Sequence, residues 1–172
     1  MVDHRTRPSA RPFPLALLVA LVGLLPACRA PGPPAGPGDA VVTKDVDGDT
    51  VDVSVHGHHE RLRLIGIDTP ETKDPRKPVQ CYGPEASART AALLPVGTAV
   101  RLQRDEEPRD DYGRLLAYVY RAGDGLFVNL ELAREGMAVV LSIKPNTAFA
   151  PVIAAAVDRA RAARLGLWGH CR

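Results

Sequence analysis

Acidic side chains and arginines gather in three short stretches of the chain. They are DVDGDT (residues 45–50), RLRLIGIDTPETK (61–73) and DDYGRLLAY (110–118). Carboxylates are the oxygen ligands that hard cations prefer, and the planar fork of arginine matches phosphate oxygens. Together such groups supply charge neutralisation, metal activation of water and a general base, which are the parts needed to hydrolyse a phosphodiester.

In the first stretch, Gly48 permits a tight turn between two predicted strands. Asp49 shares odd numbering with the valines that follow it, so its carboxylate projects from an apolar face and needs a partner, commonly a cation. The alternative is a turn aspartate that accepts backbone N–H bonds. An EF-hand is excluded, because counting from Asp45 puts Thr50 and His56 where that loop needs glycine and glutamate.

The second stretch begins as a strand and then changes character. Arg63 lies within the predicted strand and Asp68 at its end, and Pro70 stops the ladder and leaves Glu71 in a loop. Once the strand ends adjoin, Asp49, Asp68 and main-chain carbonyls form a plausible Ca²⁺ or Mg²⁺ site. A phosphate would bridge such a metal and the arginine.

The third stretch places Tyr112 and then Arg114 beside a glycine turn, at the start of a predicted strand. Taken alone, it is more typical of a surface hairpin with solvated charges. This stretch matters because Arg114 could bind the same phosphate as Arg63.

Composition limits how the protein could bind a polyanion. The chain has 172 residues, of which 45% are hydrophobic and 24% charged, as in an ordinary globular domain. When the three arginines and one aspartate of the first 28 residues are set aside, 19 basic and 19 acidic side chains remain. A broad basic surface is therefore disfavoured, and phosphate contacts must come from a few placed side chains.

Residues 1–28 have the features of a signal peptide: arginines, an apolar run over 15–25 and a small-residue ending. The ending LPAC resembles a bacterial lipoprotein signal, which predicts an acylated Cys28 and a membrane contact through that lipid alone. Two alternatives stay open, an uncleaved membrane anchor and ordinary secretion with cleavage near Ala27 or Ala30. The expected location is the cell envelope, otherwise the periplasm or medium.

The remaining chain divides into a Pro/Gly-rich linker, residues 29–39, and a folded domain, residues 40–172. Oxidising conditions outside the cell favour a disulfide between Cys81 and Cys171, with two buried free thiols as the alternative. No CxxC motif supports a zinc or redox site.

Within the domain, period-two patterns predict strands and helical spacing predicts helices. The strands fall at 40–46, 50–55, 61–67, 98–103 and 115–121, and the helices at 83–94, 128–136 and 150–166. Because strand signals come first and helices fill in around them, the sequence predicts an α+β fold, a small barrel with packed helices.

Six motifs, DGDT, RLIGIDTPET, YGPEAS, DDYGRLLAYVY, VNLELAREGMA and IKPN, occur in the order and spacing of the staphylococcal nuclease (thermonuclease) family. The chain resembles that family over roughly residues 41–168. The resemblance implies a five-stranded OB-fold barrel with three helices. It also implies a monomeric enzyme and Ca²⁺-dependent hydrolysis of DNA and RNA that leaves 3′-phosphate ends.

The resemblance also implies roles for individual residues. The metal ligands would be Asp49, Asp68 and the main-chain carbonyl of Thr69, with Asp47 in the outer coordination sphere. The arginines that bind phosphate would be Arg63 and Arg114, with Tyr112 contacting the substrate. Glu71 would be the general base or would position the water. The Lys144–Pro145 bond matches one that is cis in the type enzyme.

Two positions depart from the family pattern. Asp111 stands where the type enzyme has a lysine, and Leu141 stands where it has a tyrosine. One change replaces a positive contact with a negative one, and the other removes a stacking face, so we expect weaker or differently tuned substrate binding. The rival interpretation, a non-catalytic OB-fold binding module, is disfavoured because the acidic residues and arginines are all present.

Overall fold

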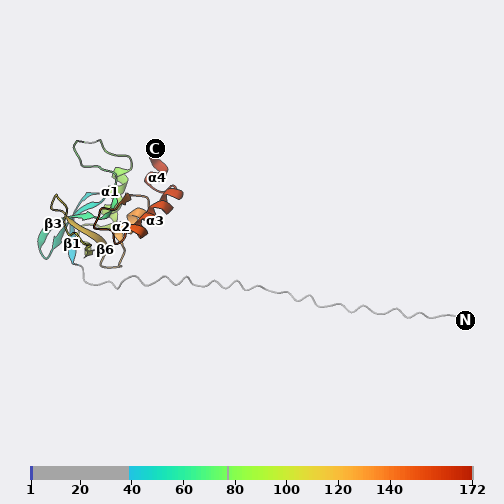
Figure 1. Cartoon of the computed structure of the whole chain (residues 1–172), viewed down its shortest axis with the longest axis horizontal. Helices are drawn as coiled ribbons and strands as arrows, with labels where there is room; N and C mark the ends of the chain where they lie inside the picture. Colours follow the sequence, from blue (N-terminus) through green and yellow to red (C-terminus); the bar gives the residue numbers. More distant parts are fainter. Residues whose placement is uncertain (2–38, 77, 172) are drawn as a thin grey trace. The chain divides into compact units, whose positions relative to one another are not determined.

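The computed structural model describes residues 39–76 and 78–171 together with Met1. In this part of the chain, five strands close into a barrel in the order β1-β2-β3-β6-β5. Their bounds are β1 Ala40–Asp47, β2 Thr50–Val55, β3 His58–Leu64, β5 Ala99–Gln103 and β6 Leu115–Arg121. Figure 1 shows β1 and β3 at one end of the domain and the C-terminal helices at the other.

The barrel closes where β3 runs parallel to β6, with Arg63 opposite Leu116. The other barrel pairs are antiparallel, and β1 is irregular at two points, between Val42 and Lys44 and between Asp45 and Asp47. Irregularities of this kind bend a strand and sharpen its twist, which closure of a small barrel requires. The predicted barrel and α+β fold are confirmed.

The prediction of one continuous strand over 61–67 is wrong in two respects: the strand begins earlier, at His58, and it is not continuous through residue 67. β3 ends at Leu64, and a separate strand, β4 Gly66–Asp68, pairs with β7 Val139–Leu141 outside the barrel. Gly66 has φ of 84°, a conformation that glycine adopts readily, and a Cβ there would lie 2.7 Å from Ile153 Cδ1. The bend therefore favours glycine for its backbone angle, and a larger residue would also have to displace the end of the Ile153 side chain.

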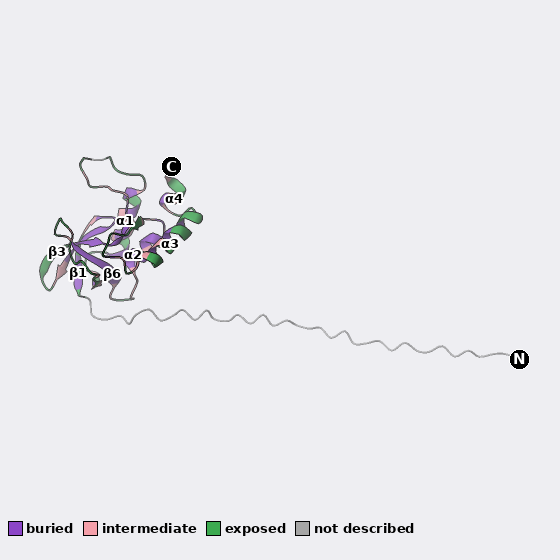
Figure 2. Ribbon diagram, viewed as in Figure 1, coloured by how far each residue is buried: buried purple, intermediate pink, exposed green. Residues whose placement is uncertain are grey.

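Three helices occupy the predicted places: α1 Gly83–Leu93, α2 Val128–Arg134 and α3 Ala150–Ala162. The last two end earlier than expected, and a single turn, α4 Leu167–His170, follows. Buried residues of the barrel and helices form one core. Figure 2 colours the ribbon of buried residues purple, and much of the ribbon of α3 is green, which marks exposed residues. No helix in the described part of the chain is long and apolar enough to span a bilayer.

Predictions about residues 1–28, Cys28 and nearly all of the linker lie outside the described residues. In the described part, Cys81 and Cys171 are joined by a disulfide bond. The peptide bond between Lys144 and Pro145 is cis.

Candidate active site

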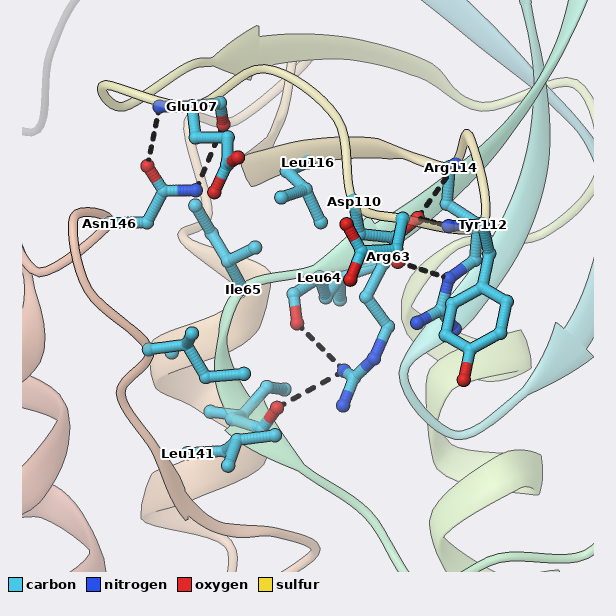
Figure 3. Close-up of a pocket in the computed structure, with 14 residues that line it drawn as sticks. Arg63, Leu64, Ile65, Glu107, Asp110, Tyr112, Arg114, Leu116, Leu141 and Asn146 are labelled. Carbon is cyan, nitrogen blue, oxygen red and sulfur yellow. Dashed lines mark hydrogen bonds and ion pairs between the residues drawn. The ribbon is translucent and has the colours of Figure 1, made fainter.

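Arg63 is held at the point where β3 bends away from the barrel. Its Nη1 donates to the carbonyl of Leu64 at 2.9 Å, which Figure 3 shows, and to that of Ile67 at 3.1 Å. The two carbonyls lie on either side of Gly66, where the backbone has φ of 84°. Only 10% of the arginine side chain is exposed, so its position is fixed by the fold.

Two carboxylates face this guanidinium from different parts of the chain. Arg63 Nη1 lies 3.0 Å from Asp49 Oδ2, and Nη2 donates to Asp68 Oδ1 at 2.8 Å. Asp49 Oδ2 also accepts two hydrogen bonds from Thr69, one from its backbone N–H at 3.0 Å and one from its side-chain hydroxyl at 3.2 Å. The β1–β2 turn and the end of β4 therefore meet, and Arg63 is the cationic partner that the apolar-face position of Asp49 requires.

Asp47 and Glu71 lie beside this cluster. Asp47 Oδ1 accepts the backbone N–H of Gly48 at 2.8 Å and the Thr72 hydroxyl at 2.7 Å, and burial raises the pKa of Asp47. Glu71 Oε1 accepts the backbone N–H of Lys73 at 2.6 Å. That hydrogen bond is the largest cause lowering the pKa of Glu71, so the carboxylate form that a general base needs is favoured.

Arg114 immediately precedes β6, one residue earlier than the predicted strand start. Asp110 holds it twice, accepting its backbone N–H at 2.9 Å and its Nε at 2.7 Å. The guanidinium carbon lies 5.4 Å from the ring centroid of Tyr112, and that tyrosine is 86% exposed. Sequence reasoning missed Asp110, although an acid four residues before an arginine across a glycine turn was a usable signal.

Two cavities meet at Arg114 and Tyr112, which line both. One, of about 290 Å³, is also lined by Arg63, Asp111 and Leu141. Figure 3 shows the Arg63 guanidinium directed toward the Leu64 carbonyl and the Arg114 side chain beside the ring of Tyr112. The second, of about 520 Å³, is lined by Asp47 and Glu71.

The structure thus places the predicted arginines and the predicted base around two neighbouring cavities that share Arg114 and Tyr112 in their walls. The expected metal ligands Asp49, Asp68 and Thr69 line neither of these two cavities. Asp49 and Asp68 contact the Arg63 guanidinium, and the backbone N–H of Thr69 donates to Asp49. Sequence reasoning also missed Asn146, which shapes the far side of the first cavity. Its side chain accepts the backbone N–H of Glu107 at 2.8 Å and donates to the carbonyl of the same residue at 2.9 Å (Figure 3).

The donor chemistry near Arg63 fits a hard divalent cation. Burial raises the pKa of Asp68. Arg63 opposes this pKa shift, whereas the carboxylates of Asp49 and Glu71 add to it, so negative charge is crowded here. Among the described residues, no group of three or more His, Cys, Asp or Glu side chains is arranged to hold a metal. The expected set, two carboxylates and one main-chain carbonyl, would leave other positions to water or substrate, as oxygen-ligated cations often do.

A family model described as staphylococcal nuclease homologue matches residues 61–170. The thermonuclease of Staphylococcus intermedius is 44% identical over 128 residues, which cover 74% of each chain. The chain belongs to the staphylococcal nuclease family. The thermonuclease of Staphylococcus hyicus is 41% identical over 129 residues, 75% of each chain. Endonuclease YncB of Bacillus subtilis (strain 168) is 38% identical over 132 residues, which cover 76% of this chain and 61% of YncB.

Membership of the staphylococcal nuclease family supports nuclease activity on nucleic acids. In this member, both positions that depart from the pattern expected of the family, Asp111 and Leu141, line the cavity beside Arg63. Leu141 is 38% exposed, and the neighbouring Ile143 is 63% exposed. The wall of this cavity therefore presents aliphatic side chains and a carboxylate to whatever binds there.

Proposed function

We propose that the protein is a Ca²⁺-dependent nuclease that hydrolyses phosphodiester bonds of DNA and RNA and leaves 3′-phosphate ends. The observation that carries the proposal is the contact of one guanidinium, Arg63, with both Asp49 and Asp68. A phosphate-binding group and two hard oxygen donors thus share one cluster, beside a cavity with a second arginine. A phosphate placed there would be neutralised from both sides.

Asp49, Asp68 and the main-chain carbonyl of Thr69 would hold the ion, with Asp47 in the outer coordination sphere. When bound, Ca²⁺ would polarise the phosphate oxygens as a Lewis acid. Within that arrangement, the side chains of the chain itself do three things: they orient the phosphate, accept a proton and contact the rest of the substrate.

Arg63 and Arg114 would hold phosphate oxygens through their planar forks. Asp110 engages Nε of Arg114, so the terminal nitrogens are the part left to meet a ligand. Glu71, favoured as a carboxylate by its backbone hydrogen bonds, would orient a water molecule and accept its proton. Attack in line with the P–O5′ bond would break that bond, and Tyr112 would contact the nucleotide.

Localisation and assembly belong to the same proposal. We infer export of a monomer, held at the cell envelope by a lipid on Cys28 or otherwise released to the periplasm or medium. Support comes from the sequence of residues 1–28. Labelling cells with a fatty-acid analogue should mark the wild-type protein and leave a Cys28→Ala variant unmarked, and equal labelling of both would exclude the anchor.

The proposed chemistry is tested by end-group analysis of digested DNA and RNA. Products should carry 3′-phosphates and 5′-hydroxyls, and Arg114→Ala should slow their formation at least about 100-fold, as expected for loss of a group that stabilises transition-state charge. Arg159→Ala, which removes an exposed arginine on α3, serves as the matched control and should cleave normally. Binding of DNA or RNA without cleavage by the wild-type protein would instead show a binding module.

A further inference from the structure

The loop that carries Glu71 is closed on itself by Gln80. The backbone N–H of Glu71 donates to Gln80 Oε1 at 2.8 Å, and the backbone N–H of Gln80 donates to the carbonyl of Glu71 at 3.0 Å. Inside the loop, Glu71 Oε1 accepts the N–H groups of Lys73 and Asp74. The place of Glu71 is therefore set by the place of Gln80.

The start of α1 rests directly on the same loop. A Cβ at Gly83 would lie 3.1 Å from the carbonyl oxygen of Pro70, 3.3 Å from that of Glu71 and 2.7 Å from Thr72 Cγ2. The backbone at Gly83 is thus packed against the backbone of residues 70–71. Movement of the segment 80–83 would be passed to Glu71 through hydrogen bonds and through hard contact.

Beyond the loop, the C-terminal turn provides a fixed anchor. The backbones at Gly136 and Gly166 approach too closely to admit a Cβ, and the N–H of Leu167 donates to the Gly136 carbonyl at 2.9 Å. The guanidinium carbon of Arg161 lies 4.2 Å from the ring centroid of Trp168. The turn is therefore attached to α2 and α3, which pack on the barrel.

Two links join this anchor to the loop. One is the disulfide between Cys171 and Cys81, the residue next to Gln80. The other is the stacking of His170 on Tyr82, with ring centroids 5.1 Å apart. Cys81 is exposed, so a small dithiol can reach the bond. Such a reductant gives two electrons and two protons to the bridge, leaving two thiols and becoming a cyclic disulfide itself.

We propose that the Cys81–Cys171 bridge and Gln80 position Glu71, so that the rate of hydrolysis depends on whether this disulfide is intact. The inference rests on the proposed nuclease function. We call the pair of hydrogen bonds between Glu71 and Gln80 the clasp, and the loop that it closes the clasped loop. Arg63 on β3 and Arg114 beside β6 lie outside this loop. Reduction should therefore lower kcat and leave KM nearly unchanged, because phosphate binding stays intact while the group that acts on water shifts.

The decisive experiment measures kcat and KM with and without dithiothreitol at fixed free Ca²⁺, in the full chain carrying Cys28→Ala in every arm. Reduction should lower kcat at least about tenfold, since a displacement of about 1 Å can cost about 100-fold. Dithiothreitol should leave kcat unchanged in the Cys81→Ser/Cys171→Ser variant, which has no bridge to reduce. It should also lower kcat no further in Glu71→Gln, because the positioned group is already absent. An equal loss with and without Glu71, a rise in KM alone, or no loss would overturn the proposal.

Two further measurements keep the test independent of folding and of the nuclease assignment. Gln80→Ala should lower kcat, whereas Gln80→Glu, which keeps an acceptor oxygen, should restore most of it; equal loss in both would count against the clasp. Trypsin should cleave after Lys73 and Arg76 several-fold faster in the reduced protein, with the far-ultraviolet circular dichroism unchanged, and an unchanged cleavage rate would overturn the clasp. Absence of any hydrolysis by the oxidised protein would refute the proposed function. The trypsin cleavage rates would still test whether the disulfide holds the loop in place.

Discussion

Arg63 and Asp49 form a buried ion pair, with 3.0 Å between Nη1 and Oδ2 and 10% of each side chain exposed. Asp49 comes from the β1–β2 turn and Arg63 from the end of β3, so the pair joins two elements that must meet for the site to exist. Removing one partner of such a pair leaves a buried charge unpaired, which costs more than the intact pair contributes.

Arg63→Ala should therefore lower the free energy of unfolding by about 3 kcal/mol as well as reduce activity. Urea denaturation at pH 7 without added metal measures the stability term. Arg159→Ala on the exposed face of α3 should change it by less than about 0.5 kcal/mol. A variant at position 63 that is as stable as the wild type would show that the ion pair does not hold the turn to the strand.

Glu71→Gln should lower kcat by about 10²- to 10⁴-fold, the contribution typical of a general base, with little change in KM. Single-turnover cleavage of a short oligonucleotide measures the effect. Glu85→Gln, which changes an exposed carboxylate on α1, is the control and should behave as the wild type. Near-normal cleavage by the Glu71 variant would remove this residue from the mechanism.

Asp111→Lys should lower KM, because a carboxylate that lines the cavity beside the arginines repels a polyanion and a lysine would attract it. The gain should shrink as salt rises, since the added contact is electrostatic. Asp158→Lys, on exposed α3 with a side chain 75% exposed, makes the same charge change elsewhere. If both variants lowered KM equally, the effect would come from net charge, and the position of Asp111 in the cavity would not explain it.

Asp52 offers a test of stability against pH. Its side chain is 5% exposed, and a hydrogen bond from Arg61 lowers its pKa below the ordinary value of 3.8. A lowered pKa in the folded state means that this stabilisation is fully present above 3.8 and is lost as the pH falls through the folded-state pKa.

Asp52→Asn should thus reduce the free energy of unfolding by about 1–2 kcal/mol at pH 7. The difference from wild type should narrow only below the ordinary pKa of 3.8. Denaturation curves collected from pH 7 to pH 3 measure it. If the difference in free energy of unfolding disappeared well above pH 3.8, another titrating group would be responsible.

The sequence predicted the barrel because valines alternate strictly along β2 and because strand signals precede helix signals. It predicted that Asp49 needs a partner, commonly a cation, because a carboxylate on an apolar face cannot stay unpaired. The division of residues 61–67 into β3 and β4 could not be predicted from their apolar pattern, because it depends on the positive φ of Gly66 and on the pairing of β4 with β7, which is distant in sequence.

Long-range polar contacts were the other part beyond reach of the sequence. The side-chain amide of Asn146 hydrogen-bonds the backbone N–H and carbonyl of Glu107, 39 residues away in sequence. Nothing in the sequence near either residue indicates that contact. Asp52 alternates with the valines of β2, yet Arg61 and His59 cover it, because long side chains on a neighbouring strand can shield a carboxylate from water. In both cases tertiary neighbours, not strand periodicity, decide the environment.

The central claim, that Asp49 and Asp68 hold a cation used in phosphodiester hydrolysis, is tested most directly by the initial rate of plasmid cleavage against free Ca²⁺. The rate should fall to background with chelator and return when Ca²⁺ is restored. Asp68→Asn should need at least about tenfold more Ca²⁺ for half-maximal rate, since a metal loses affinity when an anionic ligand is neutralised. Cleavage that continues in chelator, or an unshifted Ca²⁺ requirement in the variant, would contradict the account.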